Sequence, residues 1–268
     1  MRGLRIAGWI LLGLVVLSSL AADILAPAPY AKQFREAPNA APSRIHPLGT
    51  DALGRDRLSR TLYGTRVSLV LAPAAALVST FLAAVIGALA GYLGGTWKRA
   101  AMAGTDLFLS LPWLFLLITV RSMLPLNVSP FTSVLLTFLI LGVLGWAASA
   151  RVLCAGASAI RESDIVLQAR ATGMHGWRLL AVHVVPNLKP VLYAQFWISV
   201  PVFILSEANL GILGLGVAEP LPSWGSLLRE LESFTGFSTE PWKLVPLILL
   251  IMVVTGFQML LSREEVSL

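Results

Sequence analysis

Residues 68–93 read SLVLAPAAALVSTFLAAVIGALAGYL, and no charged side chain occurs in this run. A helix needs about 20 predominantly apolar residues to cross the hydrocarbon core of a bilayer. The run is longer than that, so it predicts a helix that spans a membrane.

Five further apolar stretches reach or approach the same length. The chain of 268 residues is 56% hydrophobic and 13% charged, whereas soluble domains carry about 25% charged residues. So few polar side chains could not cover a water-soluble fold. The sequence therefore predicts an all-α fold, a polytopic membrane helix bundle with about six transmembrane helices. The expected spans are residues 6–25, 68–93, 104–124 (interrupted by Pro112), 130–153, 190–210 and 244–262.

The net charge of +6 fits the same interpretation. Basic residues flank the apolar spans, where they face anionic lipid headgroups. The lipid bilayer, and not nucleic acid, is therefore the expected partner of these charges. Cys154 is the single cysteine, and at the end of an apolar span we expect it to be a small packing residue.

The first apolar stretch has two interpretations. Arg2 and Arg5 precede an apolar run that ends in small residues, a pattern typical of a cleaved secretory signal and equally of a retained anchor. The five further spans favour retention. We divide the chain into an anchor helix at 1–25, a proline-rich linker with a short interfacial helix at 26–67, a transmembrane core at 68–262 and a cytoplasmic tail at 263–268.

Basic residues also indicate orientation, because short cytoplasmic segments are enriched in lysine and arginine. With both termini in the cytoplasm, the inside segments hold more basic residues than the outside turns at 121–129 and 211–243. Segment 26–67 opposes this orientation. We expect it to form an interfacial element, with an extended linker at 26–45 and a helix from Leu53 to Tyr63 capped by Asp51. Its basic residues are Lys32, Arg35, Arg44, Arg55, Arg57, Arg60 and Arg66.

The longest inside segment is the loop at 154–189. Ser163 is placed to cap a helix that begins at Asp164, and Gly173 stands where a helix end favours a left-handed residue. A second short helix is expected from Trp177 to Val185. Pro186 and Pro190 then redirect the chain into the fifth span.

This arrangement would present Met174, His175 and Trp177 around the glycine corner. Large side chains exposed on a turn are typical of a docking surface. A loop packed on its own bundle is the alternative, and the residues alone leave both open.

Two features of this loop resemble the signature loop of permease subunits of ABC importers. The first is the spacing of Gly173, nine residues, His183, one residue and Val185-Pro186. The second is the run 168–173, QARATG, which is similar to the branch that imports dipeptides, oligopeptides and nickel. Gln168 and His183 depart from the family pattern. Residues 46–64 and 207–225 are similar to the C-type subunit of that branch, so the resemblance covers about residues 46–262.

The resemblance implies an importer with a second permease subunit, two ATPase subunits that hold ATP and Mg, and an external solute-binding protein. This chain would form half of the pathway for peptides in a bacterial inner membrane. Nickel or another small solute is the alternative cargo, and a non-transporting membrane scaffold is the alternative class. The expected ATPase-coupling residues are Ser163, Asp164, Gln168, Ala169, Arg170, Ala171, Gly173, Met174, His175, Trp177 and Pro186.

The segment after the fifth span would form the external gate or the receptor-docking surface. Glu207 is expected to make structural hydrogen bonds there, with substrate contact as the alternative. Trp224 is either an interfacial anchor or part of the docking surface. The full set is Glu207, Gly214, Gly216, Pro222, Trp224 and Gly225.

Catalytic and metal-binding patterns are missing from the sequence. There is no G-x-x-x-x-G-K-[ST], no H-E-x-x-H and no G-x-S-x-G, and the histidines are scattered at 46, 175 and 183. We therefore expect no enzymatic activity, no metal and no cofactor on this chain.

Overall fold

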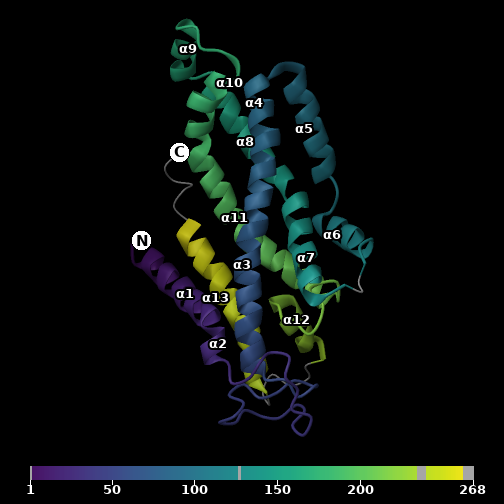
Figure 1. The fold of residues 1–268 in the computed structure, drawn as a ribbon. Coiled ribbons are helices and arrows are strands. Elements are labelled where there is room, and N and C mark those ends of the chain that lie inside the picture. Colours follow the sequence, from purple (N-terminus) through teal and green to yellow (C-terminus); the bar gives the residue numbers. More distant parts are fainter. Residues whose placement is uncertain (1, 126–127, 234–239, 262–268) are drawn as a thin grey trace. The chain divides into compact units, whose positions relative to one another are not determined.

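A computed structural model describes residues 2–125, 128–233 and 240–261. The all-α fold is confirmed: these residues form helices and two isolated β-bridges, and no strand occurs among them. Figure 1 traces the elements in chain order. They are α1 (Arg2–Leu20), α2 (Ala22–Leu25), α3 (Arg57–Ala83), η1 (Ala84–Ala88), α4 (Leu89–Leu93), α5 (Gly95–Leu109), α6 (Trp113–Ser122), α7 (Pro130–Leu144), α8 (Trp146–Arg161), α9 (Asp164–Ala171), α10 (Gly176–Leu179), η2 (Leu180–Val184), α11 (Val185–Ile212), α12 (Trp224–Arg229), η3 (Glu230–Ser233), η4 (Pro241–Leu244) and α13 (Val245–Leu261).

Four helices of the described chain are long and apolar enough to cross a membrane: Arg57–Leu93, Pro130–Arg161, Gly176–Ile212 and Pro241–Leu261. The third expected span is a broken pair, α5 and α6, bent by 81°. The bend lies at Pro112, because proline disfavours helical geometry in the residue before it. With that pair the count reaches five, so the expected number of six stays a prediction.

The described helices belong to two compact units. Unit 1 comprises 1–72, 118–138 and 201–268, and unit 2 comprises 73–117 and 139–200. The boundary between the units falls inside α3, α6, α7 and α11, so each of these helices contributes residues to both units. The consecutive division expected from the sequence stays a prediction.

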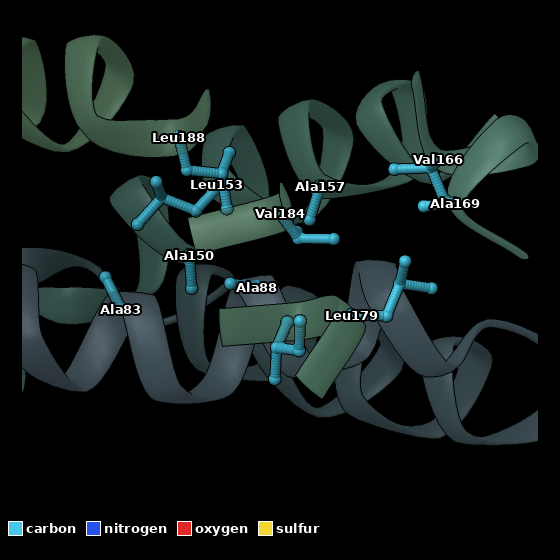
Figure 2. Packing of buried hydrophobic residues seen from close by; sticks show 11 residues of the cluster. Ala83, Ala88, Ala150, Leu153, Ala157, Val166, Ala169, Leu179, Val184 and Leu188 are labelled. Atoms are coloured by element: carbon cyan, nitrogen blue, oxygen red, sulfur yellow. The ribbon is translucent and has the colours of Figure 1, made fainter. Parts of the chain in front are cut away.

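Unit 2 has a core of small and branched apolar residues in which helices approach closely. Gly87 in η1 faces α8 so closely that a Cβ atom there would lie 2.2 Å from the carbonyl oxygen of Ala150. Gly91 makes a similar approach to Cys154. Small residues at such contacts allow backbones to pack in the absence of a hydrophobic driving force from water. Figure 2 shows this cluster, which includes Ala83, Ala88, Ala150, Leu153, Ala157, Val166, Ala169, Leu179, Leu180, Val184 and Leu188.

Replacing Gly87 with alanine tests this close approach. The added methyl group would overlap the backbone of α8, so we expect Gly87→Ala to lower the free energy of unfolding by about 2 kcal/mol. Gly104→Ala in α5 is the matched control, because nothing lies within 4 Å of a Cβ atom there. Denaturant titration in detergent micelles measures both. Equal stability of the two variants would contradict the packing described for η1 and α8.

Unit 1 joins both ends of the chain. α1 and α13 lie side by side, and Gly256 of α13 leaves room for Leu12, whose Cγ would lie 2.8 Å from a Cβ atom on that glycine. Cys154 belongs to the other unit, where it is buried and free, in keeping with the packing role expected for it.

The expected extended linker is wrong, because residues 26–56 fold back on themselves. The amide of Phe34 donates to the carbonyl of Gly54 at 2.8 Å, and the amide of Thr50 donates to that of Ala40 at 3.0 Å. Gly54 has φ +72°, and a Cβ atom there would lie 2.2 Å from the Phe34 oxygen. Backbone pairing of this kind turns a proline-rich segment into a compact loop.

The expected interfacial helix from Leu53 to Tyr63 is also wrong. α3 begins at Arg57 and continues through η1 and α4 to Leu93, a run of 37 residues. Asp56 caps it, since its carboxylate accepts the Ser59 amide at 2.7 Å. Asp51 instead accepts the amides of Leu53 and Arg55 and so closes the turn before the helix.

Candidate functional site

The loop expected to couple to an ATPase contains α9, which begins at Asp164 as expected. Ser163 occupies the N-cap position, but its hydroxyl does not cap the helix. It donates instead to the carbonyl of Ile160 at 2.6 Å. The expected side-chain cap is therefore wrong, because the hydroxyl joins the Ser163 amide on the carbonyl of Ile160 in the last turn of α8.

The glycine corner after α9 is confirmed. Gly173 has φ +86°, its amide donates to the carbonyl of Arg170 at 2.9 Å, and the amide of Met174 donates to that of Ala169 at 3.0 Å. These two bonds form the Schellman motif. The partly buried Met174 packs on the unit 2 core, so the end of α9 is fixed by backbone and side chain together.

α9 has two distinct faces. Val166 and Ala169 are buried in the unit 2 core, as Figure 2 shows. Ile165 and Leu167 are 55% and 50% exposed, and Trp177 in α10 is 75% exposed. The loop is thus both packed on its own unit and equipped with an exposed apolar surface. We call Ile165, Leu167 and Trp177 the α9–α10 surface.

Polar residues surround this surface. Asp164, Gln168 and His175 are exposed, and Arg170 is half-buried. Tyr92 donates from its hydroxyl to the carbonyl of Gly176 at 2.7 Å, which holds α10 on the end of α4. Ala171 is also exposed.

The expected proline corner at Pro186 is wrong. α10 continues through the π-helical turn η2 into α11, and the helix runs from Gly176 to Ile212 without a break. Pro186 lies in the first turn of α11, and Asn187 donates from Nδ2 to the carbonyl of His183 at 2.6 Å. The π-helical turn η2 directly before Pro186 changes the hydrogen-bond register, which lets the helix continue past a residue that has no amide.

The second expected site lies in unit 1, around the end of α11. Glu207 is fully buried, and its Oε2 accepts the hydroxyl of Ser68 at 3.3 Å. Its Oε1 has no hydrogen-bond partner among the described residues. α11 ends at Ile212, and Gly214 beyond it has φ +77° and closes a second Schellman motif.

The segment 222–229 packs closely on α11. A Cβ atom on Gly211 would lie 2.3 Å from Cα of Gly225, and α12 begins with a capping box formed by Ser223 and Ser226. Pro222 is buried. Trp224 is also completely buried, which fits neither the interfacial anchor nor the docking surface expected for its side chain.

A cluster of charges, buried or partly buried except for the half-exposed Glu219, joins the loop before α3 to the segment after α11, and no sequence pattern pointed to it. Arg60 is completely buried and donates from Nη2 to Glu219 Oε1 at 3.0 Å. Arg55 lies 2.5 Å from Glu219 and 2.6 Å from Asp51. The Arg57 guanidinium lies 2.7 Å from Glu230. We call these six residues the arginine cluster; with Arg66, which pairs with Asp23, four of the seven basic residues of 26–67 are neutralised.

The pKa values of the two glutamates respond in opposite directions. Burial alone would raise the pKa of the Glu219 carboxyl, but hydrogen bonds and charge from Arg60 and Arg55 outweigh it and hold that pKa below its usual value. Burial raises the pKa of Glu230, although Arg57 and Arg60 oppose the rise. Glu219 is therefore the more firmly ionised of the two.

Arg121, counted above in an outside turn, is also buried. It belongs to α6, with 1% of its surface exposed. Its Nη2 donates to Ser133 Oγ at 3.1 Å and to the carbonyl of Gly216 at 3.5 Å, and its Nε and Nη1 have no partner among the described residues. Buried charges of this kind in apolar helices mark functional positions.

Arg60 is the residue whose loss should disturb unit 1 most. Arg60→Met would leave Glu219 and Glu230 with less compensation, so we expect the free energy of unfolding to fall by at least about 2 kcal/mol. Arg35→Met is the control, since Arg35 is exposed and a surface charge contributes about 0–1 kcal/mol. The measurement is chemical denaturation in detergent. Equal losses for both variants would show that the cluster adds no stability.

Comparison with known proteins identifies the family. Residues 83–263 match the family described as "Binding-protein-dependent transport system inner membrane component". The chain belongs to this family. The match includes the α9–α10 surface and the segment 207–225, so both candidate regions of this inner membrane component lie inside it.

Three relatives place it among permeases. A putative peptide permease protein of Brucella suis is 34% identical over 76% of this chain and 66% of its own length. The oligopeptide transport system permease proteins of Haemophilus influenzae and Bacillus subtilis are 29% and 30% identical over 90% of this chain, and the matches cover 75% and 76% of their lengths. This inner membrane component is thus similar to permeases whose names specify peptides.

Proposed function

We propose that this inner membrane component forms half of the translocation pathway of an ATP-driven peptide importer. The names of its relatives support peptides as the cargo, and its long apolar helices supply the membrane-spanning part. The observation that carries the proposal is the α9–α10 surface: three large apolar side chains, each at least half exposed, on two short helices of which α9 is anchored in the unit 2 core.

The two faces of α9 give this surface a mechanical role. An ATPase subunit, which would hold ATP and Mg, binds Ile165, Leu167 and Trp177. Val166 and Ala169 transmit its movement, because a close-packed core passes displacement on to its neighbours without absorbing it. Closure of the ATPase pair then shifts the helices of unit 2, and the importer alternates between states a few kcal/mol apart.

The proposed orientation has both termini in the cytoplasm. Segments 26–67 and 211–233 then lie on the external side, where a solute-binding protein docks. The arginine cluster supports a common side for these two segments, because its ion pairs join them. The guanidinium groups of this cluster are already paired with carboxylates, so their charge does not require the anionic lipids of the cytoplasmic side.

The docking role of the α9–α10 surface can be tested by substitution. Leu167→Arg and Trp177→Ala should each reduce co-purification of the ATPase at least tenfold, because large apolar anchors dominate protein interfaces. Phe81→Ala is the matched control, since Phe81 is 67% exposed in α3. All three variants should insert into membranes normally. Unchanged ATPase binding in both loop variants would refute docking at this surface.

Transport itself is tested in proteoliposomes that contain the complete importer. We expect uptake of short peptides that requires both ATP and the binding protein, with nickel uptake measured in parallel. Uptake of nickel without uptake of peptides would identify nickel as the cargo and leave the proposed ATP-driven mechanism unchanged. Assembly with an ATPase but no ATP-dependent flux of either solute would identify the chain as a membrane scaffold.

A further inference from the structure

A cavity of about 270 Å³ lies within unit 1, beside the arginine cluster. Its charged lining residues are Arg55, Glu219, Arg229 and Glu230, and part of its wall is formed by glycines. Pockets for whole small molecules measure roughly 300–1,000 Å³. This cavity therefore has room for one end of a ligand.

The carboxylates in its wall are already compensated. Glu219 accepts hydrogen bonds from Arg55 and Arg60, and Glu230 pairs with Arg57 and Arg60. Arg55 in turn pairs with Asp51. The lining therefore offers no free carboxylate to an incoming cation.

Arg229 differs from the other arginines of the cavity. It is exposed, and no hydrogen bond or ion pair joins its guanidinium to any residue in the described part of the chain. Among the four charged residues that line the cavity, Arg229 is the one for which the described chain supplies no ion pair. Its positive charge is thus available to a ligand.

The Arg229 guanidinium lies next to Gly214. A Cβ atom on Gly214 would lie 3.1 Å from Arg229 Nη1 and 3.2 Å from its Cζ, so the guanidinium lies against the bare backbone of the helix end. Gly211 and Gly216 also line the cavity without side chains. The space next to Arg229 is therefore kept open by the glycines that end α11.

An unpaired guanidinium in the wall of a cavity recognises carboxylates, which it can bind through two parallel hydrogen bonds. We propose that this cavity binds the C-terminal carboxylate of a peptide through Arg229. The proposal rests on the peptide cargo proposed above and gives that cargo a contact on this chain. The remainder of the peptide would extend out of the cavity.

Direct binding to the purified importer, prepared without its binding protein, tests the proposal. The probes are dialanine, its C-terminal amide and acetate. Binding of each probe is measured by ligand-observed saturation-transfer NMR. We expect the native importer to bind dialanine about tenfold more tightly than the amide, because hydrogen bonds between charged groups are stronger than those to a neutral amide. Acetate should compete with dialanine.

Two variants assign the effect to Arg229. Arg229→Gln should lose the preference for the free acid and the competition by acetate, while its affinity for the amide stays unchanged. Gly214→Ala should weaken binding of the free acid, because the methyl group displaces the guanidinium. Arg35→Gln is the matched control, and it removes an exposed arginine outside the cavity. Co-purification of all subunits verifies that each variant is assembled.

A preference for the free acid that persists in Arg229→Gln would overturn the proposal, as would a native importer that does not discriminate between acid and amide. Both results are independent of the uptake assay. Peptide uptake by an importer that binds acid and amide equally would refute this site alone. A preference for the free acid without any ATP-driven peptide uptake would refute the proposed function and leave a carboxylate site.

Discussion

The complete burial of Arg60 is the constraint around which unit 1 is organised. A guanidinium removed from water loses several kcal/mol of solvation, which only close carboxylates and further hydrogen bonds can restore. Glu219 and Glu230 supply that compensation, together with Asp51 at 3.5 Å from Arg60 Nε. Because those acids come from segments more than 150 residues apart, the loop before α3 and the segment after α11 must fold together. The glycine end of α11 and the cavity beside it are positioned by the same pairing.

Unit 2 is held by a different physical principle. Its core contains alanine, leucine and valine, and its closest helix contacts pass through Gly87 and Gly91. Close backbone approach maximises dispersion contacts where lipid tails remove the usual advantage of apolar burial. α9 shares this core through Val166 and Ala169. The loop is therefore part of the packed interior on one face and a free surface on the other.

Local features of the sequence predicted local structure well. The sequence predicts a left-handed helix end at Gly173, because the helix before it and the residue type leave little else, and it predicts an interruption of the third span at Pro112. The predictions fail where contacts with residues distant in the sequence determine the local structure. Asp51 looked like a helix cap, but Arg55 holds it in a turn. Pro186 looked like a corner, but a π-helical turn lets the helix continue. The sequence places Arg121 in an outside turn, but it lies buried in α6. The arginine cluster could not be predicted, because no periodic pattern connects Arg60 to Glu219.

The two faces of α9 also separate two kinds of evolutionary change. Residues at Val166 and Ala169 are restricted by the volume of their own core, so they can change only in concert with α8, α10 and η2. Ile165 and Leu167 flank Val166 along the chain, and half or more of each side chain is exposed, which leaves their size less restricted. With the ATPase docked as proposed, a lineage could therefore exchange one such partner for another by altering a few exposed positions of a single short helix. Its transmembrane helices would keep their packing throughout such an exchange.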